Sequence, residues 1–277
     1  MTATTGTSGT APALKALIVD WAGTIVDHGS LAPVQVFVDT FAQSGVPITT
    51  AQARKPMGLP KRDHIEAVLR DPDVAARWQS AHGTPAGEGE VDRLYDLFVP
   101  MQVAVVGRYA KPVPGALDAL TLVRGRGLKI GSTTGYSRDV MDALIPEATR
   151  HGVTVDTVVA AGETPVGRPS PLMNWAVMVK LGVWPAAACV VVDDTVPGIA
   201  AGLAAGAWTV GVARTGNGVG LSEADWAVLS ADDQAARTAQ AVAELTAAGA
   251  HAVIDGIGAI GPVLDGFEAR LAAGLRP

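Results

Sequence analysis

The sequence predicts an α/β protein with a doubly wound parallel sheet and a helical segment inserted after the first strand. Short apolar runs alternate with helical patterns from residue 112 onward, which is typical of parallel sheets. A stretch without strand patterns separates the first apolar run from the others. We therefore expect a Rossmann-like core formed by residues 14–32 and 111–277, and an α-helical cap domain formed by residues 33–110.

Composition excludes several classes of protein. The chain has 277 residues, of which 48% are apolar, and its net charge of −6 argues against non-specific nucleic-acid binding. No apolar run is long enough to span a membrane. Residues 1–13 lack the features of a secretory signal, so we expect a disordered tail and a cytoplasmic protein. Cys189 is the only cysteine and lies in an apolar run, which predicts a buried, inert thiol.

The first half of the chain contains one strand and then helices. The apolar run at 15–20 predicts a buried strand that carries Asp20 at its tip, where Gly23 breaks the pattern. A helix cap is expected at Thr49 or Thr50. The predicted helices of this half are 33–44, 51–57, 60–69, a continuation through 78, and 90–106, with a loop at 82–89.

The second half alternates strands and helices. The predicted strands are 128–132, 157–160, 188–192, 208–212 and 252–254. The first predicted helix of this half ends at 126, and the next begins at 137. Three further helices span 171–181, 197–205 and 235–247, and the last begins at 260. This order is typical of a parallel sheet covered by helices on both faces.

Polar residues follow four of the predicted strands. They are Asp20, the run 132–135 (STTG), Arg168 within 167–169 (GRP), and the pair Asp193 and Asp194. Ligands bind at the carboxyl ends of strands in open α/β sheets. A carboxylate, hydroxyls with backbone N–H groups, a cation and further carboxylates are what phosphoryl transfer with Mg²⁺ requires. Asp20 alone could equally cap a turn, and the ordered set favours a catalytic site.

These four segments resemble the motifs of the haloacid-dehalogenase superfamily. Together with residues 53–58 (ARKPMG), Lys61, His64 and Tyr136, they resemble the phosphonoacetaldehyde hydrolase (phosphonatase) family. The resemblance implies cleavage of the C–P bond of a small phosphonate, phosphonoacetaldehyde, to acetaldehyde and phosphate. It also implies Mg²⁺, an aspartyl-phosphate intermediate at Asp20, a lysine Schiff base, and a homodimer formed through the cap.

Ala22 carries separate information. Most phosphatases of this superfamily have an Asp two residues after the nucleophile, which protonates an oxygen leaving group, whereas this chain has a methyl group there. One interpretation is an enzyme that has lost its acid–base residue. The other is a carbon leaving group, which needs an electron sink such as a lysine imine.

Lys55 and Lys61 are the candidate lysines of the cap. Lys61 lies at the start of a predicted helix near Arg54, Lys55 and Arg62, which would lower its pKa. Spacing alone favours a solvated surface lysine. The resemblance instead assigns the Schiff base to Lys61 and leaves Lys55 to shape the motif. His64, three residues after Lys61, could shuttle protons during imine formation.

The resemblance also assigns the remaining site residues. Thr134, Gly135 and Arg168 would hold the phosphoryl group, while Met57 and Tyr136 would line the substrate pocket. A core role is equally compatible with Met57, and packing with Tyr136.

The metal ligands follow the same resemblance. Asp20, the Ala22 carbonyl and Asp194 would bind Mg²⁺, with Asp193 behind them or acting through water. The chain departs from the family in having Gly198 where an acidic residue is expected and Asp193 where a glycine is expected. This departure predicts that one carboxylate has been relocated.

Two other functions fit parts of the pattern. A phosphatase for small phosphate esters would use Asp20 and Mg²⁺, but Ala22 argues against it. A non-catalytic phosphate-binding protein would need no acid–base residue, but the set of Asp20, Lys61 and Arg168 argues against that.

Overall fold

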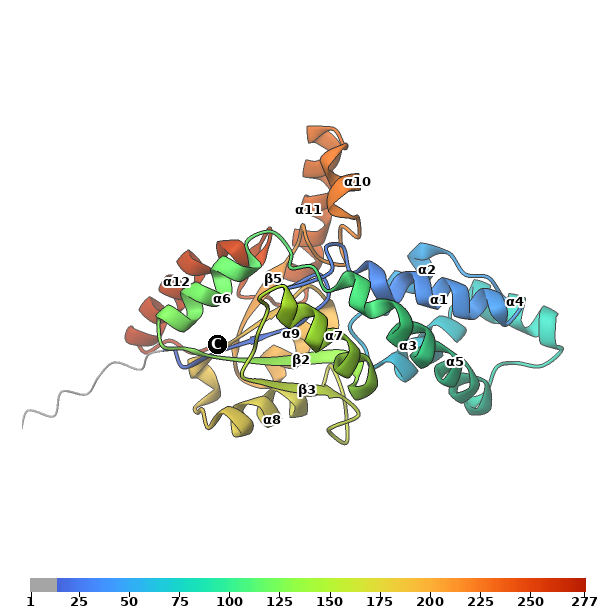
Figure 1. The fold of residues 1–277 in the computed structure, drawn as a ribbon, viewed down its shortest axis with the longest axis horizontal. Helices are drawn as coiled ribbons and strands as arrows, with labels where there is room; N and C mark the ends of the chain where they lie inside the picture. Colours follow the sequence, from blue (N-terminus) through green and yellow to red (C-terminus); the bar gives the residue numbers. More distant parts are fainter. Residues whose placement is uncertain (1–13) are drawn as a thin grey trace, which may run out of the picture.

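The computed structural model describes residues 14–277, and its core is a six-stranded parallel sheet (Figure 1). The strands are β1 (Ala16–Val19), β2 (Lys129–Ser137), β3 (Thr157–Ala161), β4 (Cys189–Asp193), β5 (Trp208–Val212) and β6 (Ala252–Ile254). Their order is β3-β2-β1-β4-β5-β6, so β1 lies between β2 and β4. The strand order reverses beside β1, which is where an open α/β sheet forms its ligand crevice. The tail predicted at 1–13 lies outside the described residues.

Helices cover both faces of the sheet, which confirms the doubly wound prediction. Leu17 and Val19 of β1 pack on the face covered by α6 (Ala116–Gly125), α7 (Arg138–Arg150) and α12 (Ile260–Ala272). Ala16 and Ile18 point to the opposite face, against α8 (Leu172–Leu181). The helix α9 (Val196–Ala204) packs on β4 and β5. This alternation follows from the two-residue repeat of a strand buried on both faces.

Five helices follow β1 and lie together at one side of the sheet (Figure 1). They are α1 (Leu31–Gln43), α2 (Thr50–Arg54), α3 (Lys61–Leu69), α4 (Pro72–His82) and α5 (Glu88–Val106). Their apolar faces form a hydrophobic cluster of their own, which includes Phe37, Trp78 and Phe98. Thr49, the first of the two candidate caps, accepts a hydrogen bond from the Gln52 backbone N–H at 3.1 Å.

Several boundaries differ from the sequence prediction. The helix α2 ends at Arg54 and not at 57, and α4 continues past 78 to His82. The strand β2 continues past 132 to Ser137, and its register with β3 shifts between Thr133 and Ser137. The helix α5 begins at Glu88, inside the predicted loop. The helix α11 (Ala231–Ala247) begins earlier than 235 because Ser230 caps it.

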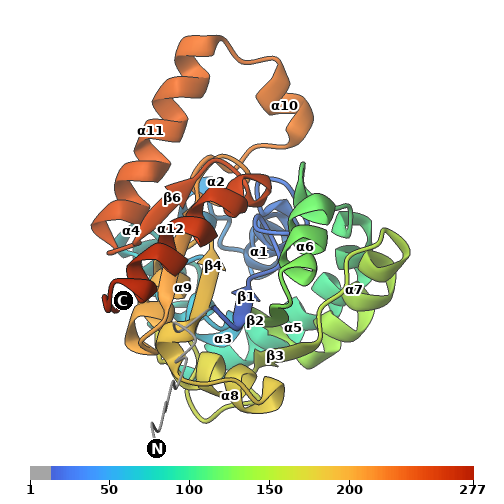
Figure 2. The ribbon, with the colours of Figure 1, turned by 90° about the vertical axis from the view of Figure 1, so that its left-hand side faces the viewer.

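The helix α10 (Glu223–Ala227) was not predicted, because five residues are too few to show a helical repeat. Figure 2 shows α10 and α11 as an arm that projects from the core. Short 3₁₀ helices occur at Gly107–Tyr109, Ala186–Ala188 and Ile257–Ala259.

Two sequence-based statements can be compared with residues 14–277. None of the helices in this range has the length and apolar character needed to cross a membrane. Cys189 is fully buried in β4, and burial raises the pKa of its thiol to about 11. The thiol is therefore inert, as predicted.

Candidate active site

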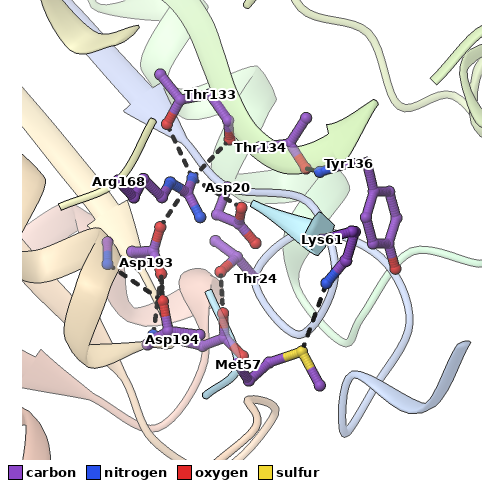
Figure 3. Close-up of polar contacts among 12 residues, drawn as sticks. Asp20, Thr24, Met57, Lys61, Thr133, Thr134, Tyr136, Arg168, Asp193 and Asp194 are labelled. Carbon is purple, nitrogen blue, oxygen red and sulfur yellow. Dashed lines mark hydrogen bonds and ion pairs between the residues drawn. The ribbon is translucent and has the colours of Figure 1, made fainter. Parts of the chain in front are cut away.

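Arg168 joins two strand ends at the floor of the site (Figure 3). Its Nη2 donates to Asp20 Oδ1 at 2.9 Å and lies 3.1 Å from Asp193 Oδ2. The same nitrogen contacts the backbone carbonyl of Thr133 at 2.8 Å and its hydroxyl at 2.9 Å. Arg168 is buried, and the adjacent carboxylates raise the pKa of its guanidinium against the opposing effect of burial. The cation is therefore fixed beside the carboxylate expected to act as nucleophile.

Three buried carboxylates meet beside this arginine. Asp20, Asp193 and Asp194 each present an oxygen atom, and these atoms all lie within 4.8 Å of one another. Burial, followed in size by the opposing attraction of Arg168, leaves the pKa of Asp20 raised to about 7. Burial and the two neighbouring carboxylates raise the pKa of Asp194 well above its usual range. Oxygen ligands and excess negative charge fit a hard divalent cation, so the residues present suit a metal site.

Two polar groups orient the Asp194 carboxylate. The Asn217 backbone N–H donates to Asp194 Oδ2 at 2.7 Å. The Thr24 hydroxyl lies 3.5 Å from Asp194 Oδ1. Asp194 is therefore held from both sides at the end of β4.

Asp193 occupies the space that a side chain at position 198 would need. A Cβ atom on Gly198 would lie 2.0 Å from Asp193 Cγ, far inside van der Waals contact. The Asp193 carboxylate accepts hydrogen bonds from the Thr195 backbone N–H at 2.9 Å and the Thr195 hydroxyl at 2.7 Å. A side chain at 198 and a carboxylate at 193 thus exclude each other in this geometry. This gives a physical basis for the sequence departure at these two positions.

Lys61 enters the site from the cap. It is the first residue of α3, and only 5% of it is exposed. Its Nζ lies 3.8 Å from Met57 Sδ and 5.4 Å and 5.3 Å from the ring centroids of Phe37 and Tyr136. Burial lowers the pKa of the amine to about 8, although the Asp20 carboxylate opposes this. The surface-lysine alternative is therefore wrong.

The cause of the lowered pKa also differs from the sequence argument. Lys55 is exposed and pairs with Asp71 at 3.7 Å, while Arg62 pairs with acidic residues of α5. Burial dominates instead, and Arg168 is the cation among residues 14–277 that lowers the pKa further. Desolvation, which depends on tertiary packing, replaces the local charges of the helix start.

Close approach at two glycines brings this lysine to the strand ends. A Cβ on Gly135 would lie 2.9 Å from the Leu59 carbonyl oxygen. A Cβ on Gly58, which has a φ of +96°, would lie 2.3 Å from Thr195 Oγ1. The cap loop before α3 can approach β2 and α9 this closely because both positions lack side chains.

One pocket is lined by residues of both the core and the cap. It brings together the predicted residues Asp20, Ala22, Met57, Lys61, Thr134, Gly135, Tyr136, Arg168 and Asp194, and adds Ser30, Pro33, Gly58 and Thr195. Burial raises the pKa of the Tyr136 hydroxyl well above 10, so this side chain is a neutral wall of the pocket.

His64 does not line this pocket. Its ring is fully buried and stacks on Phe37 with a centroid distance of 3.8 Å. Nε2 lies 2.8 Å from the Ala53 carbonyl oxygen and must donate to it, which leaves Nδ1 as an acceptor without a protein partner among the described residues. Burial, together with the nearby Lys61, lowers the pKa of His64 well below 6.5, so the ring is neutral.

Sequence reasoning missed several residues that orient the site. Thr133 lies inside the run 132–135 and Thr24 lies four residues after Asp20, but neither was selected, although hydroxyls at strand ends are a usable signal. Asn217 lies in a loop with no recognisable pattern. Arg54 belongs to the run 53–58 and contributes a charge near Lys61 in the sequence analysis, but its contacts across the chain were not expected: its guanidinium reaches Gly29, Asn217 and Gly220.

Comparison with known proteins identifies the family of this chain. Residues 14–206 match the model of the haloacid dehalogenase-like hydrolases. The chain is 50% identical over 266 residues to a phosphonoacetaldehyde hydrolase of Aeromonas hydrophila, which covers 95% of each protein. It is 46% identical over 264 residues to one of Paraburkholderia xenovorans, covering 95% of this chain and 99% of that protein.

A solved structure is also similar over nearly the whole chain. A phosphonoacetaldehyde hydrolase-like protein from Oleispira antarctica has a TM-score of 0.95 and 41% identity, covering 96% of this chain and 97% of that one. A β-phosphoglucomutase of Clostridium difficile, with a TM-score of 0.65 and 17% identity, shares the fold alone.

Proposed function

The chain belongs to the haloacid dehalogenase-like hydrolases and, within them, to the phosphonoacetaldehyde hydrolase family, and from this premise we propose that it cleaves the C–P bond of phosphonoacetaldehyde through an imine at Lys61. The observation that carries the mechanism is the Lys61 amine, buried in the same pocket as Asp20. Ala22, which lines this pocket, offers no acid for an oxygen leaving group. An imine removes the need for that acid, because it accepts the electrons of a carbon leaving group.

Imine formation begins at Lys61. The free amine attacks the aldehyde carbon, and loss of water gives a protonated imine. A pKa near 8 makes a useful fraction of free amine available at neutral pH. Phe37 and Tyr136 exclude water around the nitrogen, and Met57 Sδ provides a weak acceptor for its proton.

His64 is proposed to assist this step. Its neutral ring has a free acceptor at Nδ1, so it can relay the proton that moves from the attacking nitrogen to the oxygen that leaves as water, directly or through water. Since His64 stands outside the pocket wall, this role depends on a relay rather than on contact with substrate.

Cleavage of the C–P bond occurs at Asp20. A carboxylate oxygen attacks phosphorus, the C–P bond breaks, and its electron pair forms the C=C bond of an enamine while the imine nitrogen becomes neutral. Arg168, Thr134 and Gly135 bind the phosphoryl oxygens on which charge accumulates. Protonation of the enamine carbon and hydrolysis then release acetaldehyde and regenerate Lys61.

The remaining product is an aspartyl-phosphate at Asp20. Water attacks its phosphorus and returns the free carboxylate and phosphate. Mg²⁺, held by Asp20, Asp194 and the Ala22 carbonyl with Asp193 behind them, would neutralise the phosphoryl charge in both steps. Asp193 acts here by fixing Arg168.

Trapping with borohydride tests the proposal. Borohydride added with phosphonoacetaldehyde should reduce the imine and leave a covalent adduct that peptide mass spectrometry locates at Lys61. Lys55→Ala is the matched control, because Lys55 is an exposed cap lysine and its loss should leave the adduct unchanged. Full activity in Lys61→Ala would rule out the imine mechanism.

A second assay separates this function from that of a phosphatase for small esters. Coupled detection of acetaldehyde and phosphate, with and without Mg²⁺, should show turnover of phosphonoacetaldehyde far above that of a generic phosphate ester. Binding without phosphate release would instead support a non-catalytic protein. We also propose a homodimer formed through the cap and a cytoplasmic location, which light scattering and cell fractionation test.

A further inference from the structure

One cap arginine makes four hydrogen bonds across the boundary with the core, the longest of them from Nη1 to the Ser30 carbonyl at 3.5 Å. Arg54, the last residue of α2, donates from Nη1 to the Gly29 carbonyl and to Asn217 Oδ1, each at 2.9 Å. Its Nη2 donates to the Gly220 carbonyl at 2.9 Å. Gly29 lies between β1 and α1, whereas Asn217 and Gly220 lie in the loop after β5. Arg54 therefore ties the cap to the linker and to the core.

The partner loop is shaped to receive this guanidinium. A Cβ on Gly220 would lie 2.7 Å from Arg54 Cζ, so the flat group rests directly on the backbone there. The Asn217 side chain also reaches back, with Nδ2 3.5 Å from the Arg54 carbonyl. The contact is thus specific in both directions and depends on the forked geometry of arginine.

The same loop residue controls a predicted metal ligand. The Asn217 backbone N–H donates to Asp194 Oδ2 at 2.7 Å, while its side chain accepts from Arg54. A single residue thus connects the cap to the carboxylate at the end of β4. Arg54 itself does not line the catalytic pocket, so its contribution is to position other groups.

We propose that Arg54 and Asn217 form a latch that couples closure of the cap over Lys61 to the position of Asp194. When the cap is closed, Arg54 holds Asn217, and Asn217 holds Asp194. Coupling between two sites is reciprocal, so a cation bound at Asp194 should in turn favour the closed cap. The importance of Lys61 rests on the proposed function, but the latch itself does not.

Chemical labelling of Lys61 tests the latch without substrate. Lys61 is 5% exposed in the closed structure, so a water-soluble acylating reagent should modify it slowly. In Arg54→Met, loss of the four hydrogen bonds from this charged donor should increase the labelling rate about tenfold or more. Peptide mass spectrometry measures this rate at Lys61 alone.

Magnesium provides the second readout. Mg²⁺ should slow Lys61 labelling in the unmodified chain, and this effect should largely disappear in Arg54→Met and in Asn217→Ala, which keeps the backbone N–H to Asp194. Calorimetric titration should show weaker Mg²⁺ binding in Arg54→Met, by several-fold. Circular dichroism checks that both variants are folded.

Arg62→Met is the matched control. Arg62 is also a cap arginine, but its hydrogen bonds reach Glu88 and Asp92 within the cap. The rate of Lys61 labelling in Arg62→Met, and the effect of Mg²⁺ on that rate, should equal those of the unmodified chain. Unchanged labelling in folded Arg54→Met would overturn the latch, and an undiminished Mg²⁺ effect in both latch variants would overturn the coupling. Neither result depends on whether the C–P bond is cleaved.

Discussion

The pocket buries one cation on the core side, which we call its floor, and one on the cap side, which we call its roof. The pKa of the floor cation is raised and that of the roof cation is lowered. Arg168, on the core side, has carboxylate and threonine oxygens around one nitrogen, and its pKa is raised. Lys61, on the cap side, has a thioether and two aromatic rings, and its pKa falls to about 8. Both side chains are buried, so burial alone does not decide the protonation state.

The difference follows from the neighbours of each cation. Adjacent carboxylates compensate Arg168 for the water it has lost, whereas Lys61 has no carboxylate within ion-pair distance among the described residues. The core thus maintains a permanent charge that can bind phosphoryl oxygens. The cap produces an amine that can lose its proton and act as a nucleophile.

Exchanging the roof cation should have the largest effect. Lys61→Arg keeps a positive charge but removes the amine, so imine formation is abolished and kcat should fall by ~10⁴-fold or more. The coupled acetaldehyde assay measures this. Since Lys55→Arg changes an exposed lysine in the same cap, its kcat should stay unchanged. Appreciable activity in Lys61→Arg would mean that the charge, and not the amine, is what the roof supplies.

Exchanging the floor cation should cost less. Arg168→Lys keeps a charge but shortens the side chain and removes the guanidinium nitrogen Nη2, which contacts Asp20, Asp193 and Thr133 together. We expect kcat/KM for the phosphonate to fall about 10²-fold, comparable with the loss of one transition-state donor. Borohydride trapping at Lys61 should persist, because the imine forms on the cap side. Loss of trapping would show that imine formation at Lys61 depends on Arg168.

The pH dependence of imine formation tests the lowered pKa directly. Free amine is the reactive form, so trapping of Lys61 with acetaldehyde should fall about tenfold per unit of pH below the pKa, which is about 8. Met57→Glu places a carboxylate beside Nζ and should move this midpoint upward. Met57→Leu is the apolar control and should leave it in place. A midpoint near 10.5 in the unmodified chain would contradict the claim that burial lowers the pKa of Lys61.

A change at Gly198 should have the smallest effect. It should lower the stability of the fold and disturb the contacts of Asp193 on the core side of the pocket. In Gly198→Ala the new methyl would overlap the Asp193 carboxylate, which must then leave Thr195 and Arg168. We expect unfolding to become easier by about 1–3 kcal/mol, measured by denaturant titration.

Gly266→Ala provides the matched control for this change. Gly266 is also helical, but a Cβ there meets nothing within 4 Å, so alanine should stabilise α12 by about 0.5–1 kcal/mol. The double change Asp193→Gly with Gly198→Asp should recover part of the activity lost in Asp193→Gly, since it returns a carboxylate to the same space. No recovery would mean that the two positions are not interchangeable.

The sequence alone determined the sheet, the inserted helices and most of the pocket. Asp20, Thr134, Arg168 and Asp194 could be selected because parallel strands bring all their carboxyl ends to one edge, so a linear order of motifs becomes a cluster. The missing acid at Ala22 and the departure at Gly198 were also visible, because each is a single residue type at a known spacing.

Only the tertiary structure decided the environments of these residues. Spacing alone favoured a surface lysine at Lys61, and only the family resemblance assigned it to the site. Its burial between Phe37 and Tyr136 depends on packing between segments far apart in the chain. The same holds for Arg54 and Asn217, which lie 163 positions apart. Desolvation and long-range hydrogen bonds depend on which segments meet in space, and a local pattern of residue types does not contain that information.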